Sequence, residues 1–185
     1  GHIDLQSFIG TNLAWGYFGM GDMKKTLLLV EESVALDRKT GNMPNLSFSL
    51  GTLGGAYFVL GEWDKGEQIL QEGMSISQKL NDIQQIAGGY SWLGWVNFSK
   101  EEYSKAKECF EKAREVYEKA GAKYLQMSVS GMVIWAHIEL GELQEASSLL
   151  DKLYEFALKI KDKELIALAD ARRGMLFRAQ KKWKE

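Results

Sequence analysis

An internal repeat of about 40 residues constrains this sequence more than any other feature. One column of the repeat holds large apolar residues: Met23, Trp63, Tyr103, Leu143 and Trp183. Ten positions earlier, another column reads Leu13, Leu53, Leu93, Val133 and Arg173. No insertion or deletion is needed to keep the columns aligned. Such periodicity is typical of architectures in which each unit buries its apolar side against its neighbours. We therefore predict a stack of similar units.

Each repeat is predicted to form two helices. Apolar residues recur three and four apart over 103–120, and charged residues occupy the opposite side, as in an amphipathic helix. Glycine and asparagine tolerate the left-handed conformation that ends a helix. The turns within repeats are predicted at Gly21, Gly61 and Gly141, and those between repeats at Gly41, Asn81, Gly121 and Lys161. The first helix of the third repeat is expected at 83–99.

This pattern predicts an all-α fold, an α-solenoid of about nine helices with the start of a tenth at Trp183. We expect a single array over 1–185, with repeats at about 3–41, 42–81, 82–121, 122–161 and 162–185. The last repeat is truncated, which predicts a fragment with an uncapped end. Small residues are expected where the two helices of a repeat cross: Ala14, Gly54, Gly94, Gly174, Gly66, Ala106 and Ala146.

Composition excludes several classes of function. The formal net charge of −2 provides no general attraction for nucleic acid or anionic lipid. The longest apolar stretch, around 132–140, is too short to span a bilayer. Cys109 is the only cysteine, so no intrachain disulfide can form, which fits a reducing cytoplasm. Gly1-His2 is interpreted as the remnant of an expression tag.

The sequence contains no arrangement that favours catalysis. Gly16 and Gly21 have the spacing of a phosphate-binding loop, but Asp22 follows where lysine is required. His137 occupies a column that elsewhere holds Tyr17, Tyr57 and Phe177, which indicates a packed core histidine. Cys109 lies next to a packing residue and has no cysteine partner for a metal site. We predict no catalytic residue, no metal site and no cofactor, and hence no enzyme.

Some segments carry a known motif. Leu53-Gly54-x-x-Tyr57 is followed by Gly61-x-Trp63-x-x-Gly66, and Tyr103-x-x-Ala106-x-x-x-Phe110 repeats the second part. These segments resemble the tetratricopeptide repeat (TPR) family. The usual TPR unit has about 34 residues and a closing proline, whereas the unit of this sequence is longer and lacks that proline. Both departures imply second helices about one turn longer. The 40-residue unit is similar to those of maltose-activator-type regulators and G-protein-signalling modulators.

The resemblance implies a right-handed superhelix of antiparallel helix pairs whose first helices line a concave groove. The first helices carry a second apolar stripe at i, i+3, i+7 and i+10, on the side that would face this groove. The candidate ligand-binding residues are Phe8, Trp15, Phe18, Phe48, Phe58, Trp95, Phe98, Trp135, Ile138 and Arg178. A column of small residues lies between them: Thr11, Gly51, Ser91, Gly131 and Ala171.

Two interpretations of this stripe stay open. The aromatic residues could form the core between repeats, or they could form a groove floor where the small residues leave room for a ligand. The second interpretation predicts a scaffold that binds a peptide or helical segment of a protein partner. Cations on this side are confined to Arg172 and Arg178, so an acidic C-terminal peptide is not expected in the central groove.

A different function is possible for the same aromatic stripe. It could form the pocket of a sensory or regulatory arm, holding a small molecule or an intramolecular segment within a larger transcription or signalling regulator. The uncapped C-terminal end also predicts self-association of the chain. A direct nucleic-acid or membrane partner is not expected.

Overall fold

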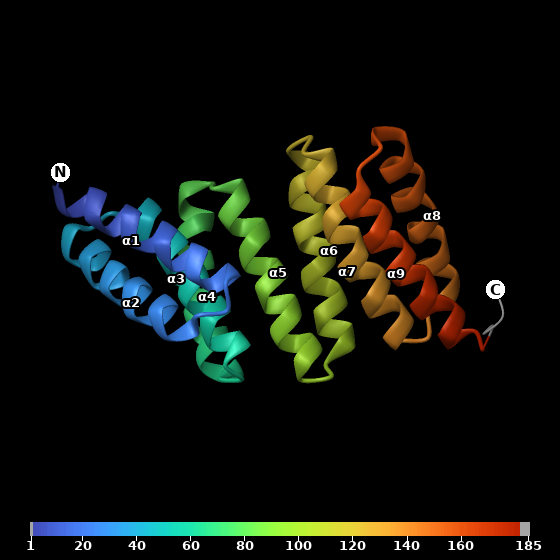
Figure 1. Ribbon diagram of the computed structural model, residues 1–185, viewed down its shortest axis with the longest axis horizontal. Coiled ribbons are helices and arrows are strands. Elements are labelled where there is room, and N and C mark those ends of the chain that lie inside the picture. The colour runs from blue at the N-terminus through green and yellow to red at the C-terminus, as the bar shows by residue number, and fades with distance from the viewer. Residues whose placement is uncertain (1, 182–185) are drawn as a thin grey trace. The chain divides into compact units, whose positions relative to one another are not determined.

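All regular structure in the residues that the computed structural model describes, 2–181, is helical (Figure 1). The nine helices of this range are α1 (His2–Gly19), α2 (Met23–Thr40), α3 (Met43–Val59), α4 (Trp63–Leu80), α5 (Ile83–Ser99), α6 (Tyr103–Lys119), α7 (Lys123–Glu139), α8 (Leu143–Ile160) and α9 (Lys163–Ala179). From α2 onward the first residues of the helices are evenly spaced along the chain, so each repeat is one helix pair. The predicted all-α fold of paired helices is confirmed. The predicted tenth helix at Trp183 lies outside the described residues.

The turns end each helix through a left-handed residue. Gly21 has φ of 78° and Gly41 has φ of 70°, and the same conformation recurs at Gly61, Asn81, Glu101, Gly121, Gly141, Lys161 and Lys181. The amide of Gly21 donates to Phe18 O and the amide of Asp22 donates to Tyr17 O, both at 3.0 Å. These bonds satisfy carbonyl groups that a helix end leaves without partners. All seven predicted turn positions are confirmed.

The described residues belong to two compact units, which we call the N-terminal unit (1–96) and the C-terminal unit (97–185). In the N-terminal unit, α2 contacts both α1 and α3, and α3 contacts α4. The apolar core of this unit consists of Ala14, Val30, Val34, Leu46, Leu50, Leu53 and Tyr57.

Small residues let α3 and α4 approach closely, as predicted. A Cβ atom added to Gly66 would lie 3.0 Å from Gly54 O and 3.3 Å from Phe58 N, both backbone atoms. A Cβ atom added to Gly54 would lie 2.5 Å from the Leu70 side chain. Bulkier residues at either position would therefore force the two helices apart.

A polar network lies inside the N-terminal unit. The side chain of Asp37 on α2 is completely buried. The Ser7 hydroxyl on α1 donates to one carboxyl oxygen of Asp37, and the Ser49 hydroxyl on α3 donates to the other at 2.8 Å. Thr11 Oγ1 and Ser49 Oγ are 2.7 Å apart. Since these residues come from three helices, the network links α1, α2 and α3.

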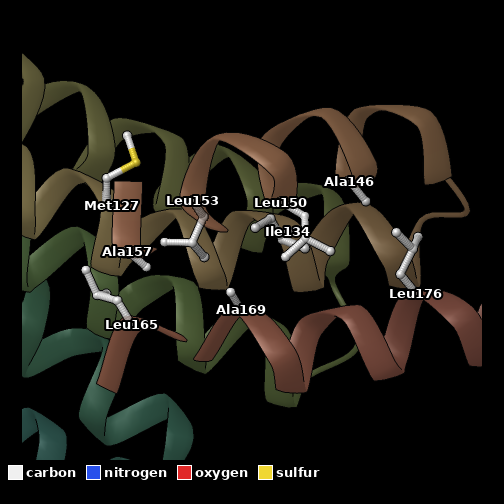
Figure 2. Packing of buried hydrophobic residues seen from close by; sticks show 9 residues of the cluster. All are labelled: Met127, Ile134, Ala146, Leu150, Leu153, Ala157, Leu165, Ala169 and Leu176. Carbon is white, nitrogen blue, oxygen red and sulfur yellow. The ribbon is translucent and has the colours of Figure 1, made fainter. Parts of the chain in front are cut away.

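The core of the C-terminal unit lies between α7, α8 and α9 (Figure 2). Ile134 of α7, Leu150 and Leu153 of α8, and Leu165 and Leu176 of α9 are at most 3% exposed. Figure 2 shows that their side chains, with those of Ala146, Ala157, Ala169 and Met127, converge from all three helices. Helix α8 thus packs against the first helix of its own repeat and against that of the next.

His137 is a buried histidine, as predicted, and it takes part in a charged cluster. Its Nδ1 atom lies 2.6 Å from Glu142 Oε2 across the α7–α8 turn. The Lys107 ammonium of α6 donates to both oxygens of Glu142 at 2.8 Å. Chiefly because of Lys107, and with a smaller contribution from His137, the pKa of Glu142 is lowered. The cluster fixes the α7–α8 turn against α6.

Candidate functional site

In the N-terminal unit, three of the predicted ligand-binding residues, Trp15, Phe18 and Phe58, belong to one aromatic cluster. Trp15 and Phe18 stack on α1 with ring centroids 5.4 Å apart and planes inclined by only 1°. Phe18 meets the edge of the Trp92 ring at 5.8 Å, and Phe58 of α3 contacts the same indole at 5.8 Å. We call Trp15, Phe18, Phe58 and Trp92 the N-terminal aromatic cluster. Trp15 is 48% exposed, so one end of the cluster faces solvent.

Sequence reasoning missed Trp92, which joins the other members of this cluster. Trp92 lies on α5, one turn before the predicted residue Trp95. A Cβ atom added to Gly55 would lie 3.0 Å from the Trp92 ring. Gly55 occupies the column that holds tryptophan at 15, 95 and 135. The missing side chain at 55 therefore leaves a space on α3 that Trp92 fills. The glycine at position 55 of the tryptophan column was the available signal.

The C-terminal unit contains a second aromatic cluster, formed by Phe98, Tyr103 and Trp135. Phe98 packs against Trp135 with centroids 4.7 Å apart and against Tyr103 at 5.0 Å. The Trp135 indole N–H donates to Glu139 Oε1 at 2.9 Å. We call these three residues the C-terminal aromatic cluster. Sequence reasoning selected Phe98 and Trp135 for ligand binding, whereas Tyr103 was assigned only to packing.

Arg172 of α9 covers one side of this cluster. Its guanidinium carbon lies 4.7 Å from the centroid of the Trp135 ring, which is a cation–π arrangement. Its Nε atom donates to Gly131 O at 2.7 Å. Burial lowers the pKa of Arg172, but an arginine side chain remains protonated at neutral pH. The structure thus places a positive charge directly beside Trp135.

A surface hollow of about 290 Å³ lies between α7 and α9, and two of its lining residues are hydrogen-bonded to the Trp135–Arg172 pair: Glu139 to Trp135 and Met175 to Arg172. It is lined by Ile138, Glu139, Met175, Arg178 and Ala179. Two predicted residues, Ile138 and Arg178, are therefore brought to one place. The lining combines apolar side chains with a carboxylate and a guanidinium, which can hold a side chain of a ligand and orient its polar groups.

Two of the small residues between the aromatic positions, Thr11 and Gly131, do not leave room for a ligand. Thr11 is buried and is bonded to Ser49. A Cβ atom added to Gly131 would lie 2.7 Å from the Leu168 side chain of α9. At these two positions the small residue accommodates the next first helix, whereas Gly51 and Ser91 are partly exposed and Ala171 is exposed. The expectation of open space therefore fails at Thr11 and Gly131 and stays a prediction at the other three positions.

None of the ten candidate residues is fully buried. Phe8, Trp15 and Arg178 are exposed, and the other seven are partly exposed. Phe8 and Phe48 take no part in the ring contacts of the described residues. Trp95 lies on α5 in the N-terminal unit, and Phe98 follows on the same helix. The assignment of the ten residues to a ligand stays a prediction.

The part of the chain that the structure describes, residues 2–181, was also searched for groups of metal ligands and for membrane-spanning helices. No three His, Cys, Asp or Glu residues of this part are grouped as metal ligands. Over the same range, every helix is too short or too polar to cross a bilayer.

Comparison with known proteins shows the fold. A scan against models of protein families found no match, and a search of curated proteins found none. Among solved structures, the chain is similar to a kinesin light chain of Podosopora anserina that has nearly identical TPR-like repeats. The two structures match with a TM-score of 0.75 and 19% sequence identity, and the match covers 94% of this chain and 86% of the kinesin light chain. The apo form of RapI matches with a TM-score of 0.83 at 16% identity, and the match covers 96% of this chain and 67% of RapI. A further Rap protein matches with a TM-score of 0.80 at 13% identity, and the match covers 98% of this chain and 56% of the Rap protein.

Proposed function

We propose that this chain, which has the TPR-like helical repeat fold, is a protein-interaction scaffold that binds a peptide or helical segment. Within a unit, the ligand would lie along the first helices and contact the aromatic cluster of that unit. The observation that carries the proposal is the group of side chains around Trp135. A partly exposed tryptophan, a guanidinium and a hollow of about 290 Å³ occupy adjacent positions on α7 and α9.

The chemistry of these groups favours a polypeptide ligand. Aromatic side chains and arginine are the residue types that contribute most binding energy at protein interfaces. Trp15 is 48% exposed and Phe8 is 50% exposed on α1, so apolar surface is accessible in the N-terminal unit too. The hollow beside Trp135 is open to solvent, which suits a side chain of an extended segment better than an enclosed small molecule.

One structural neighbour supports this proposal. The Rap protein that matches at a TM-score of 0.80 was solved in complex with competence and sporulation factor. This chain spans 56% of the length of that protein. A fold of this kind therefore accommodates a bound factor, which supports the proposal that the aromatic clusters of this chain contact a polypeptide ligand.

The test is a selection of random peptides on the full chain, followed by affinity measurement of the selected peptides. We expect Trp135→Ala or Trp15→Ala to weaken their binding at least tenfold, because each variant removes an aromatic contact surface. Trp63→Ala is the matched control, because Trp63 is 37% exposed but lies on a second helix. Circular dichroism verifies that the helical content is unchanged. Peptides that bind both groove variants as tightly as the parent chain would show that the aromatic clusters are not the binding surface.

A further inference from the structure

A separate apolar surface lies on the outer side of α1. Ile9 is 48% exposed and Leu13 is 51% exposed, and Gly16 continues the same side of the helix. We call Leu5, Ile9, Leu13 and Gly16 the outer face of α1. This face is distinct from the predicted groove side of α1, which carries Phe8, Trp15 and Phe18.

The repeat positions of Ile9, Leu13 and Gly16 are largely buried in the later first helices, whereas Leu125 in the column of Leu5 is 40% exposed. In the column of Leu13, the later residues Leu53, Leu93 and Val133 are at most 7% exposed. The column of Ile9 is at most 6% exposed at Ser49, Val129 and Ala169. The column of Gly16 is at most 3% exposed at Ala56, Val96, Ala136 and Leu176. In α1 alone, therefore, these columns retain a large exposed apolar area.

The repeat also shows what covers these positions elsewhere. Helix α9 is covered by the second helix of the preceding repeat, α8, and Leu165, Ala169 and Leu176 share one core cluster with Leu150 and Leu153 of α8. These three residues of α9 correspond to Leu5, Ile9 and Gly16, which lie four repeats earlier in the sequence. The outer face of α1 thus has the position of a surface that an amphipathic helix covers.

The outer face is hollowed where α1 meets α2, two helices that lie side by side (Figure 1). A hollow of about 190 Å³ is lined by Ile9, Gly10 and Leu13 of α1 and by Leu29, Ser33 and Leu36 of α2. Gln6 and Glu32 complete its lining, and with Ser33 they form its polar part. An apolar side chain of a docked helix can enter this hollow, and a basic residue next to it can pair with Glu32.

We propose that the outer face of α1 binds an amphipathic helix of a partner protein, seated on α1 and α2 as α8 is seated on α9. The partner helix carries an apolar stripe at i, i+4 and i+7 with a lysine or arginine beside it. This is the helix-in-groove mode of recognition. In a second copy of the chain, the second helices α2 and α8 are already enclosed, since α2 contacts α1 and α3, and α8 contacts α7 and α9.

The test uses the full chain and a fluorescein-labelled synthetic peptide with the sequence 143–160, the helix that covers the equivalent face of α9. Fluorescence anisotropy should show saturable binding, and a peptide of the same composition in scrambled order should not bind. Leu13→Glu should weaken the binding at least tenfold because it places a carboxylate on the apolar face. Leu28→Glu is the matched control, because Leu28 is 68% exposed on α2 and does not line the hollow.

Two outcomes would overturn the proposal. The first is absence of binding, or binding that Leu13→Glu leaves unchanged while circular dichroism shows the variant to be folded. The second is a concentration-dependent dimer of the parent chain in sedimentation equilibrium that Leu13→Glu abolishes, since the occupant would then be a second copy. A parent chain that stays monomeric and binds the peptide through Leu13 supports the proposal.

Discussion

Replacing Asp37 by alanine should destabilise the N-terminal unit. The carboxyl group of Asp37 is completely buried and accepts hydrogen bonds from Ser7 and Ser49. Asp37→Ala removes both bonds and leaves a small void between three helices. The later repeats hold Ser77, Tyr117 and Ala157 in this column, so the fold itself does not require an acid there. The cost arises from the hydroxyl groups that were arranged around Asp37.

The expected magnitude follows from the partners that remain. Each buried donor left without a partner costs about 1–3 kcal/mol. Ser7 retains a weak alternative in Ser33 O at 3.3 Å, and Ser49 retains Thr11 at 2.7 Å. The cost for each of the two hydroxyl groups is therefore near the lower limit of this range, and the void adds a further loss of stability. We expect a total of about 2–4 kcal/mol.

Urea unfolding followed by circular dichroism measures this loss. With a slope of about 2 kcal/mol per molar urea, the midpoint should fall by about 1–2 M. Asp151→Ala is the control, because this exposed residue of α8 should change stability by less than about 0.5 kcal/mol. A loss of less than about 0.5 kcal/mol in Asp37→Ala would refute the reasoning, as would additive effects of Asp37→Ala and Ser7→Ala in a double-mutant cycle.

Two further predictions concern helix packing and pH. Gly66→Ala should lower the free energy of unfolding by about 1–3 kcal/mol, because the added Cβ atom would lie 3.0 Å from Gly54 O. Gly16→Ala should raise the free energy of unfolding by about 0.5–1 kcal/mol, because no atom lies within 4 Å of the added Cβ atom and alanine favours the helix. Urea unfolding of both variants checks this, and equal losses would contradict it. Lys107 lowers the pKa of Glu142 in the folded chain, so the stability that Glu142 contributes is present at neutral pH and is lost as the pH falls through its folded pKa. The stability difference between the parent chain and Glu142→Gln should therefore shrink below about pH 4.5, the ordinary glutamate value, and a pH-independent difference would exclude this linkage.

The turn positions show why the helices were predictable. A helix end is a local event, which needs a residue that tolerates positive φ and a polar residue to begin the next helix. Gly21 and Asp22 supply both, and a left-handed residue recurs at every later turn. Even Glu101 and Lys161 adopt the left-handed conformation, because the repeat imposes the turn on residue types that rarely adopt it.

The aromatic sites were only partly predictable. The 3.6-residue period placed Trp15 and Phe18 on one side of α1, and they do stack. The period could not show that Trp92 of α5 fills the space beside Gly55 of α3, since that contact joins two helices that are not consecutive in the sequence. For the same reason it could not show that Arg172 lies over Trp135.

The sequence by itself determined the helices, their lengths and their order, because a strict period acts through local turns and through the faces of single helices. Tertiary structure alone decided how the side chains of neighbouring helices share the space between them. Gly131 looked like an opening in the sequence, but Leu168 and Arg172 of α9 occupy it. Leu13 looked like its buried counterparts Leu53 and Leu93, but it is half exposed. The exposure of a side chain depends on whether another helix covers it. A periodic pattern repeats the same residue type at covered and at uncovered positions, so it cannot distinguish a buried side chain from an exposed one.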